Sequence, residues 1–138
     1  MFSKLLLATD GSEHSIRSAK YAVELAQQFG GTIDIVYVID EKKSKADVLH
    51  HVDKYDLKKE RQEKIKPVLD LLVSENVEHH VHFSHGEPAP TIIELANEND
   101  FDCVIVGSRG LNNLQTMILG SVSHKVAKHV KCPVMIIK

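Results

Sequence analysis

Short apolar runs alternate with helical patterns along the chain, and this order predicts an α/β fold. The first run, KLLLAT over residues 4–9, ends at an Asp-Gly turn pair and is typical of a buried strand. A helix is expected from Ser12 to the glycine pair at 30–31. The second run, IDIVYVI over residues 33–39, is again a strand. Strand, helix and strand in this order are typical of a parallel sheet.

The middle of the chain predicts a loop, a helix and an edge strand. Residues 40–51 are polar and charged, which favours a surface loop. The following helix contains Pro67, which removes a hydrogen bond and predicts a kink or break near Lys66. Its stretch KYDLKKERQEKIK mixes basic and acidic residues, as a solvated helix face does. Residues 77–83 alternate as VEHHVHF and predict an edge strand with one wetter face.

The C-terminal third repeats the strand and helix pattern. Prolines at 88 and 90 open a helix, and residues 101–106 form a fourth strand. A loop leads to a helix over residues 120–130, and PVMII over residues 133–137 forms a fifth strand. Because crossovers between parallel strands are right-handed in nearly all proteins, the pattern indicates an open, doubly wound, Rossmann-like sheet with helices on both faces.

Composition narrows the class of protein without naming a function. The 138 residues are 43% hydrophobic and 26% charged, which predicts a single soluble domain over residues 1–138. The net charge of -2 argues against a dedicated nucleic-acid binder. No apolar run reaches the ~18 residues of a membrane span, and the apolar stretch near the start is too short for a signal peptide. Two cysteines outside a CxxC pair favour a reduced, cytoplasmic protein.

Candidate binding residues follow the first and fourth predicted strands. In an open α/β sheet, ligands bind at the carboxyl ends of the strands. Residues 8–12 follow the first strand, residues 107–110 follow the fourth, and Gly-Ser-Val-Ser at 120–123 opens a helix. Glycines let the backbone approach an anion, helix N–H groups point toward it, and Arg109 adds a cation. These features indicate a mononucleotide pocket, although each taken alone is also an ordinary turn or helix cap.

Four histidines near the third predicted strand form a second candidate site. The group is His79, His80, His82 and His85. His80 and His82 are two residues apart, so their side chains point to the same face of a strand. Two imidazoles at that spacing can bind zinc. The other interpretation is a solvated edge face, so the sequence leaves metal binding open.

The spacing of the glycines indicates a family. Gly107, Gly110, Gly120 and Ser121 fit the pattern G-x2-G-x9-G-S. Together with LLLATDGSEHS, IVYVID, the GEPA turn, VIVGSRG, LGSVS and CPVMII, this pattern resembles the universal stress proteins over essentially the whole chain. The spacing is similar to that of the ATP-binding branch of the family. The resemblance implies the strand order 3-2-1-4-5 and a homodimer formed through residues Val134–Ile137.

The resemblance also implies a ligand, ATP or another adenine nucleotide with Mg²⁺, and a role for each matching position. The segment ending at Asp10 lies beside the adenosine, and the backbone of Val38 recognises adenine. The first two glycines and Arg109 belong to a ribose–phosphate loop, and residues 120–123 form the triphosphate cradle. The matching residues are Ala8, Thr9, Asp10, Val38, Gly107, Arg109, Gly110, Gly120, Ser121, Val122 and Ser123.

Three functions remain open on the sequence. The first is a regulatory stress-response protein that binds ATP with little or no hydrolysis, because Asp10 is the one carboxylate that the sequence places at the pocket. The second is a slow ATPase or an adenylating enzyme of the ATP-pyrophosphatase type, although ATDGSEHS lacks that type's paired glycines and no GxxxxGK[ST] motif occurs. The third is a dimeric interaction module without nucleotide.

Overall fold

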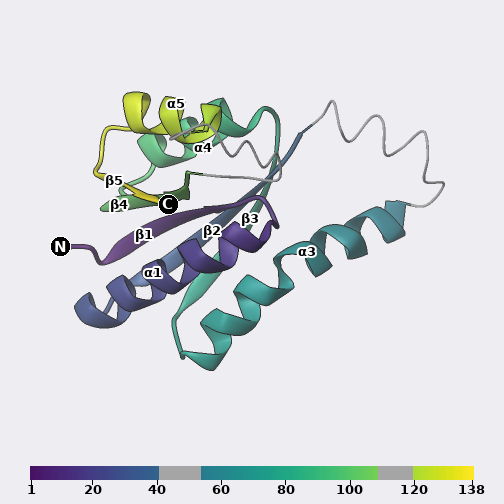
Figure 1. Cartoon of the computed structure of the whole chain (residues 1–138), viewed down its shortest axis with the longest axis horizontal. Helices are drawn as coiled ribbons and strands as arrows, with labels where there is room; N and C mark the ends of the chain where they lie inside the picture. Colours follow the sequence, from purple (N-terminus) through teal and green to yellow (C-terminus); the bar gives the residue numbers. More distant parts are fainter. Residues whose placement is uncertain (41–53, 109–119) are drawn as a thin grey trace.

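The computed structural model describes residues 1–40, 54–108 and 120–138. Its strands form one parallel sheet in the order β3-β2-β1-β4-β5 (Figure 1), as expected. The expected loops over residues 40–51 and 107–119 lie largely outside the described residues. The elements along the chain are β1 (Lys4–Thr9), α1 (Glu13–Phe29), β2 (Thr32–Ile39), α3 (Lys54–Ser74), β3 (His79–His85), α4 (Pro88–Glu98), β4 (Cys103–Gly107), α5 (Ser121–His129) and β5 (Val134–Ile137).

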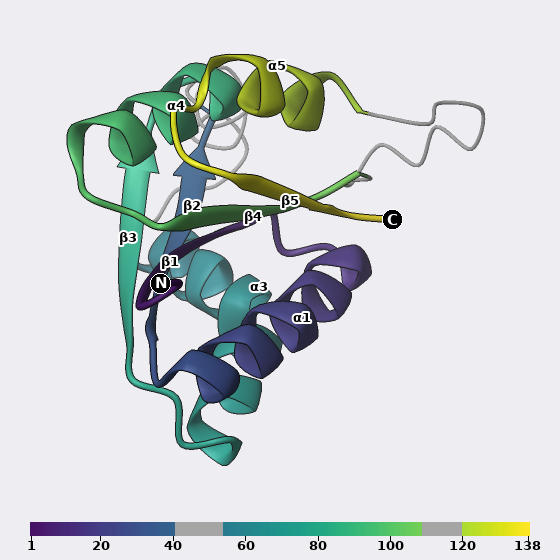
Figure 2. The same ribbon diagram turned by 90° about the vertical axis from the view of Figure 1, so that its left-hand side faces the viewer.

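Helices cover both faces of the sheet, with α1 and α3 on one face and α4 and α5 on the other (Figure 2). Side chains of a strand alternate between the faces, so each face has its own apolar cluster. Leu5 and Leu7 of β1 pack into the cluster beneath α1 and α3. Leu6, between them, packs with Ile92 and Val126 beneath α4 and α5. The central strand is buried on both faces, which is why it reads as a continuous apolar run.

The ends of α1 follow from its sequence. Ser12 stands at the N-cap position in extended conformation. Gly30 ends the helix in the left-handed conformation, with φ 64°, which glycine adopts without steric cost. Both ends lie where the sequence predicts them, and Gly30 is the residue that terminates the helix.

Helix α3 departs from the prediction at its proline. The helix continues from Lys54 to Ser74 through Pro67, so the expected break near Lys66 is wrong. Ile65, Val68 and Leu72 are buried on either side of the exposed proline. Their packing against the sheet holds the helix together where one hydrogen bond is lost.

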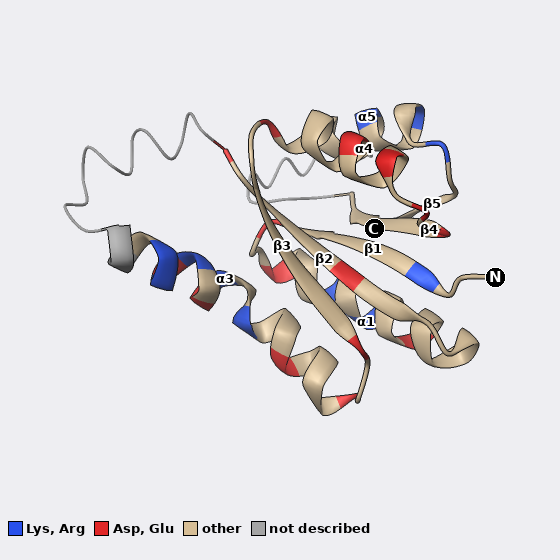
Figure 3. Cartoon of the chain, turned by 180° about the vertical axis from the view of Figure 1, so that it is seen from behind, with Lys and Arg blue, Asp and Glu red and all other residues tan. Residues whose placement is uncertain are grey.

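Basic and acidic residues are interleaved along α3, as the sequence predicts (Figure 3). Lys58, Lys59 and Lys64 are exposed beside Glu60 and Glu63. Farther along, the ammonium of Lys66 contacts the carboxylate of Asp70 at 2.8 Å, with both side chains largely exposed. This surface is therefore a solvated helix face with mixed charge.

Strand β3 lies at one edge of the sheet, as expected, but begins two residues later than the alternation suggests. The N–H of Val77 donates to the carbonyl of Leu72 at 3.0 Å, so Val77 belongs to the turn that closes α3. Phe83, which the alternation places on the same face as Val81, is 41% exposed and stacks edge-on against Tyr37 at 5.9 Å between ring centroids. The edge strand is more solvated than the sequence predicts.

Candidate functional site

The turn between β1 and α1 is held by hydrogen bonds from its own residues. Asp10 follows β1, and its Oδ1 accepts hydrogen bonds from the Ser12 N–H at 3.0 Å and the Ser15 hydroxyl at 2.8 Å. Ser15 in turn accepts a bond from the Asp10 N–H at 3.3 Å. Two donors thus fix the carboxylate of Asp10 at the carboxyl end of the central strand.

Helix α3 packs directly on this turn. Gly11 has φ 78°, and a Cβ added there would lie 2.9 Å from the Cβ of Lys64. Both the backbone conformation and this close approach require glycine. The side chain of Lys64 crosses Gly11, since its Cγ and Cδ lie 3.6 Å from the same point. Sequence reasoning did not connect Lys64 to this turn, because the contact depends on how α3 docks.

Strand β4 and the start of α5 meet through Ser108. The N–H of Ser108 donates to the carbonyl of Ile137 at 2.8 Å, and its carbonyl accepts from the Gly120 N–H at 3.0 Å. Gly107, the last residue of β4, pairs with Ile137. Gly120 is thereby held next to the end of β4 although the two are far apart along the chain. Sequence reasoning did not single out Ser108.

The two serines of the expected triphosphate cradle, at the start of α5, differ. Ser121 is exposed, whereas Ser123 is 1% exposed and its hydroxyl donates to the carbonyl of Gly120 at 3.0 Å. The hydroxyl of Ser123 therefore stabilises the first turn of α5 instead of extending outward. Ser121 is the hydroxyl that can reach a ligand there.

Three apolar residues of the candidate set lie around one cluster. Ala8 of β1, Val38 of β2 and Val122 of α5 all pack against the cluster beneath α4 and α5. Each is half-buried, while Thr9 is 6% exposed. Segments from three parts of the chain thus converge at the carboxyl edge of the sheet. Arg109 and Gly110 lie outside the described residues.

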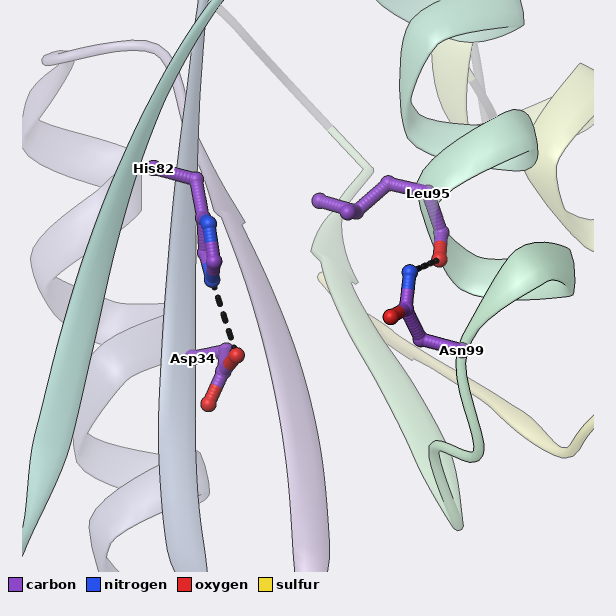
Figure 4. A network of polar contacts seen from close by, with 4 residues as sticks. All are labelled: Asp34, His82, Leu95 and Asn99. Carbon is purple, nitrogen blue, oxygen red and sulfur yellow. Dashed lines mark hydrogen bonds and ion pairs between the residues drawn. The ribbon is translucent and has the colours of Figure 1, made fainter.

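The histidines of β3 do not form a metal site in the described structure. His82 Nε2 lies 2.8 Å from Asp34 Oδ2 on the neighbouring strand (Figure 4). His79 Nδ1 contacts the carbonyl of Val77 at 2.8 Å, and His80 is exposed. Across residues 1–40, 54–108 and 120–138, no three His, Cys, Asp or Glu side chains are grouped to hold a metal ion. The solvated edge is the interpretation that these contacts support.

The two cysteines are poor nucleophiles. Burial raises the pKa of the Cys103 thiol to about 11, and burial also raises the pKa of Cys132. Because the thiolate is the reactive form, both shifts lower the reactive fraction of these thiols at neutral pH. Among the described residues, no helix is both long and apolar enough to cross a bilayer.

Comparison with known proteins identifies the family. The family model for the universal stress protein family matches residues 1–138. The chain belongs to the universal stress protein family. It is 33% identical over 148 residues to the universal stress protein YxiE of Bacillus subtilis, with all of both chains covered. It is 31% identical over 141 residues to the universal stress protein MJ0531 of Methanocaldococcus jannaschii, covering all of this chain and 83% of the relative.

Solved structures of this family share the fold. The protein MJ0577 superposes with a TM-score of 0.86 at 27% identity, covering 100% of this chain and 96% of that one. A universal stress protein of Archaeoglobus fulgidus in complex with dAMP has a TM-score of 0.73 at 22% identity, with all of both chains covered. Another, in complex with cAMP, has a TM-score of 0.70 at 22% identity, covering 99% and 96%. At 22% identity, the last two similarities show a shared fold and nothing further.

Proposed function

We propose that this universal stress protein binds an adenine nucleotide, ATP in particular, at the carboxyl edge of the sheet between β1 and β4. The observation that carries the proposal is the convergence of Ala8, Val38 and Val122 on one apolar cluster, beside the turn that holds Asp10. Open α/β sheets bind ligands where the strand order reverses, which here is between β1 and β4. Two proteins of the same fold are complexes with the adenine nucleotides cAMP and dAMP.

Each part of the site suits one part of the nucleotide. The half-buried apolar side chains give the base and ribose a surface to pack on. We assign recognition of adenine to the backbone of Val38, as the family resemblance implies. Phosphates suit the N-terminus of α5, because the N–H groups of a helix's first turn have no partner within the helix and the exposed Ser121 adds an O–H donor. For Arg109 and Gly110, which lie outside the described residues, the family resemblance alone supports a role in the ribose–phosphate loop.

Asp10 is the side chain that would hold Mg²⁺ or a ribose hydroxyl. Mg²⁺ takes oxygen ligands and is commonly held by one or two carboxylates together with substrate phosphates, which fits this turn. The Oδ1 atom of Asp10 already accepts two hydrogen bonds, which suits a positioning role better than proton abstraction from water. We therefore infer a protein that binds ATP with little or no hydrolysis, and not an adenylating enzyme. With the composition of the chain, we propose a regulatory, cytoplasmic, single-domain protein.

Ser121→Ala tests the phosphate end of the site. Loss of one hydroxyl donor to a charged oxygen removes about 1.5–3 kcal/mol, so calorimetric titration should show ATP affinity falling about 10- to 100-fold. Ser74→Ala at the far end of α3 is the matched control and should bind ATP as the wild type does. Phosphate release measured on the same samples should remain slow.

Gly120→Val is a less selective test of the phosphate end than Ser121→Ala. A Cβ at Gly120 would lie 3.0 Å from the carbonyl oxygen of Ser108, so the larger side chain also displaces the protein's own backbone. It should abolish ATP binding, but its folding must be checked by circular dichroism. Unchanged ATP affinity in both Ser121→Ala and a folded Gly120→Val would refute the pocket.

A further inference from the structure

A small cavity lies at the same carboxyl edge of the sheet as the proposed nucleotide site. It is on the face of the sheet that α1 covers, whereas the apolar cluster of the nucleotide site lies beneath α4 and α5. Its volume is about 230 Å³, and its described lining is His14, Arg17, Ser108, Ile137 and Lys138. Figure 2 shows the first turns of α1 next to the ends of β4 and β5, where these residues lie. None of these described lining residues is one that the family resemblance assigns to nucleotide binding.

The lining is suited to an anion. His14 and Arg17 are three residues apart on α1, so their side chains lie on the same side of the helix. Lys138 follows β5 and adds a second full positive charge. Among the described residues that line the cavity, none is Asp or Glu. A guanidinium flanked by other N–H donors recognises phosphate by bidentate hydrogen bonding.

The size of the cavity restricts the ligand to a small group. Pockets that enclose whole small molecules usually start at about 300 Å³. A cavity of about 230 Å³ is too small for a nucleoside but has room for a phosphate group with water. Ile137, which is 8% exposed, gives an apolar side to the cavity and limits its hydration.

Ser108 joins this cavity to the start of α5. It lines the cavity, its N–H bonds to the Ile137 carbonyl, and its own carbonyl holds the Gly120 N–H at 3.0 Å. A group bound in the cavity is therefore one residue away from the proposed phosphate cradle. We infer that the cavity is a phosphate-binding subsite in which Arg17 is the main contact. The phosphate is either inorganic phosphate or the terminal phosphate of a nucleotide, and the second source rests on the proposed function.

The test uses Arg17→Gln, with Lys59→Gln as the matched control. Both residues are exposed, and both substitutions remove one positive charge, but Lys59 lies on α3 outside the cavity. Inorganic phosphate, AMP and ATP are each titrated calorimetrically into the wild type and both variants. Arg17→Gln should weaken the binding of phosphate, of ATP or of both by about tenfold or more. Lys59→Gln should weaken the binding of each ligand by less than about tenfold. AMP should bind equally to all three proteins.

The titrations separate the two sources of phosphate. If the cavity holds the terminal phosphate of the nucleotide, Arg17→Gln weakens ATP binding, and saturating ATP prevents phosphate from binding. If it holds separate phosphate, phosphate still binds to the ATP-saturated protein and only its affinity depends on Arg17. Equal affinities for phosphate and ATP in wild type and Arg17→Gln would overturn the inference, as would absence of binding by both probes. Phosphate binding that depends on Arg17, without any binding of AMP or ATP, would overturn the proposed function alone.

Discussion

Asp102, the residue before β4, is hydrogen-bonded to Ser3 and Lys4 at the start of β1. Its Oδ2 accepts hydrogen bonds from the N–H and hydroxyl of Ser3, both at 2.9 Å, and from the Lys4 N–H at 3.0 Å. The bond from the Lys4 N–H, followed by that from the Ser3 hydroxyl, holds the pKa of Asp102 below its ordinary value. Hydrogen bonds to the charged form have this effect because they stabilise it relative to the protonated form.

Asp102→Asn should therefore destabilise the protein in a pH-dependent way. A carboxyl whose pKa is lower in the folded state stabilises the fold above its unfolded pKa, and this contribution is lost as the pH falls through the folded pKa. The free energy of unfolding from urea titration should be lower in the variant at pH 7. The difference from the wild type should shrink as the pH falls below 3.8, the ordinary pKa of an aspartate side chain. Asp100→Asn, an exposed carboxylate two residues earlier, is the control. A deficit that is the same at neutral and acidic pH would contradict this role.

At the scale of single residues, the sequence predicts turn chemistry better than it predicts contacts. Asp10 can be recognised at its turn because an Asp-Gly pair after an apolar run has a local meaning. Other features depend on how whole helices dock. These are the contact between Lys64 and Gly11, and the position of Arg17 in the same cavity lining as Ser108. The family resemblance places Ser123 in the triphosphate cradle, but local geometry directs its hydroxyl to the Gly120 carbonyl.

At the scale of elements, α3 shows how tertiary packing overrides a local rule. A proline inside a helix removes one hydrogen bond and crowds the preceding turn. The sequence rule predicts a break, but it does not include the burial of Ile65 at 1% exposure and Leu72 at 0%. The same limit explains β3, because alternation alone cannot separate a strand residue from Val77, which is buried in a turn. Long apolar runs such as β1 and β2 have no comparable ambiguity.

Pro67→Ala should stabilise the protein. The proline is exposed, so its replacement loses little packing, and alanine restores a backbone N–H to the helix. The free energy of unfolding in urea should rise by about 1–3 kcal/mol, less than the full helix-propensity difference because the unfolded chain also becomes more flexible. Gln62→Ala, another exposed position of α3, should change it by less than about 0.5 kcal/mol. A variant that unfolds at lower urea than the wild type would show that α3 requires its proline.

At the scale of the whole molecule, the two edges of the sheet differ in character. On β3, the exposed side chains include His80 and His85, and polar groups discourage pairing with another strand. On β5, the side chains from Val134 to Ile136 are apolar and half-buried. Among the described strands, β5 pairs with β4 alone. The carbonyl of Pro133 accepts from Val104 of β4, and that of Ile137 accepts from Ser108, which follows β4. The alternation of a strand therefore turns the backbone groups of Val134 and Ile136 outward.

We propose that β5 forms the interface of a homodimer, in which two copies pair antiparallel about a two-fold axis. Val134→Pro removes one outward N–H and leaves the bonds to β4 in place, since edge strands tolerate proline where the N–H faces outward. Light scattering at micromolar concentration should give the wild type twice the chain mass of 15.4 kDa and the variant a single chain mass, with circular dichroism unchanged. Val134→Thr keeps the N–H and should remain dimeric. A wild type that scatters as one chain, with and without ATP, would refute the dimer, and a dimeric Val134→Pro would place the interface elsewhere.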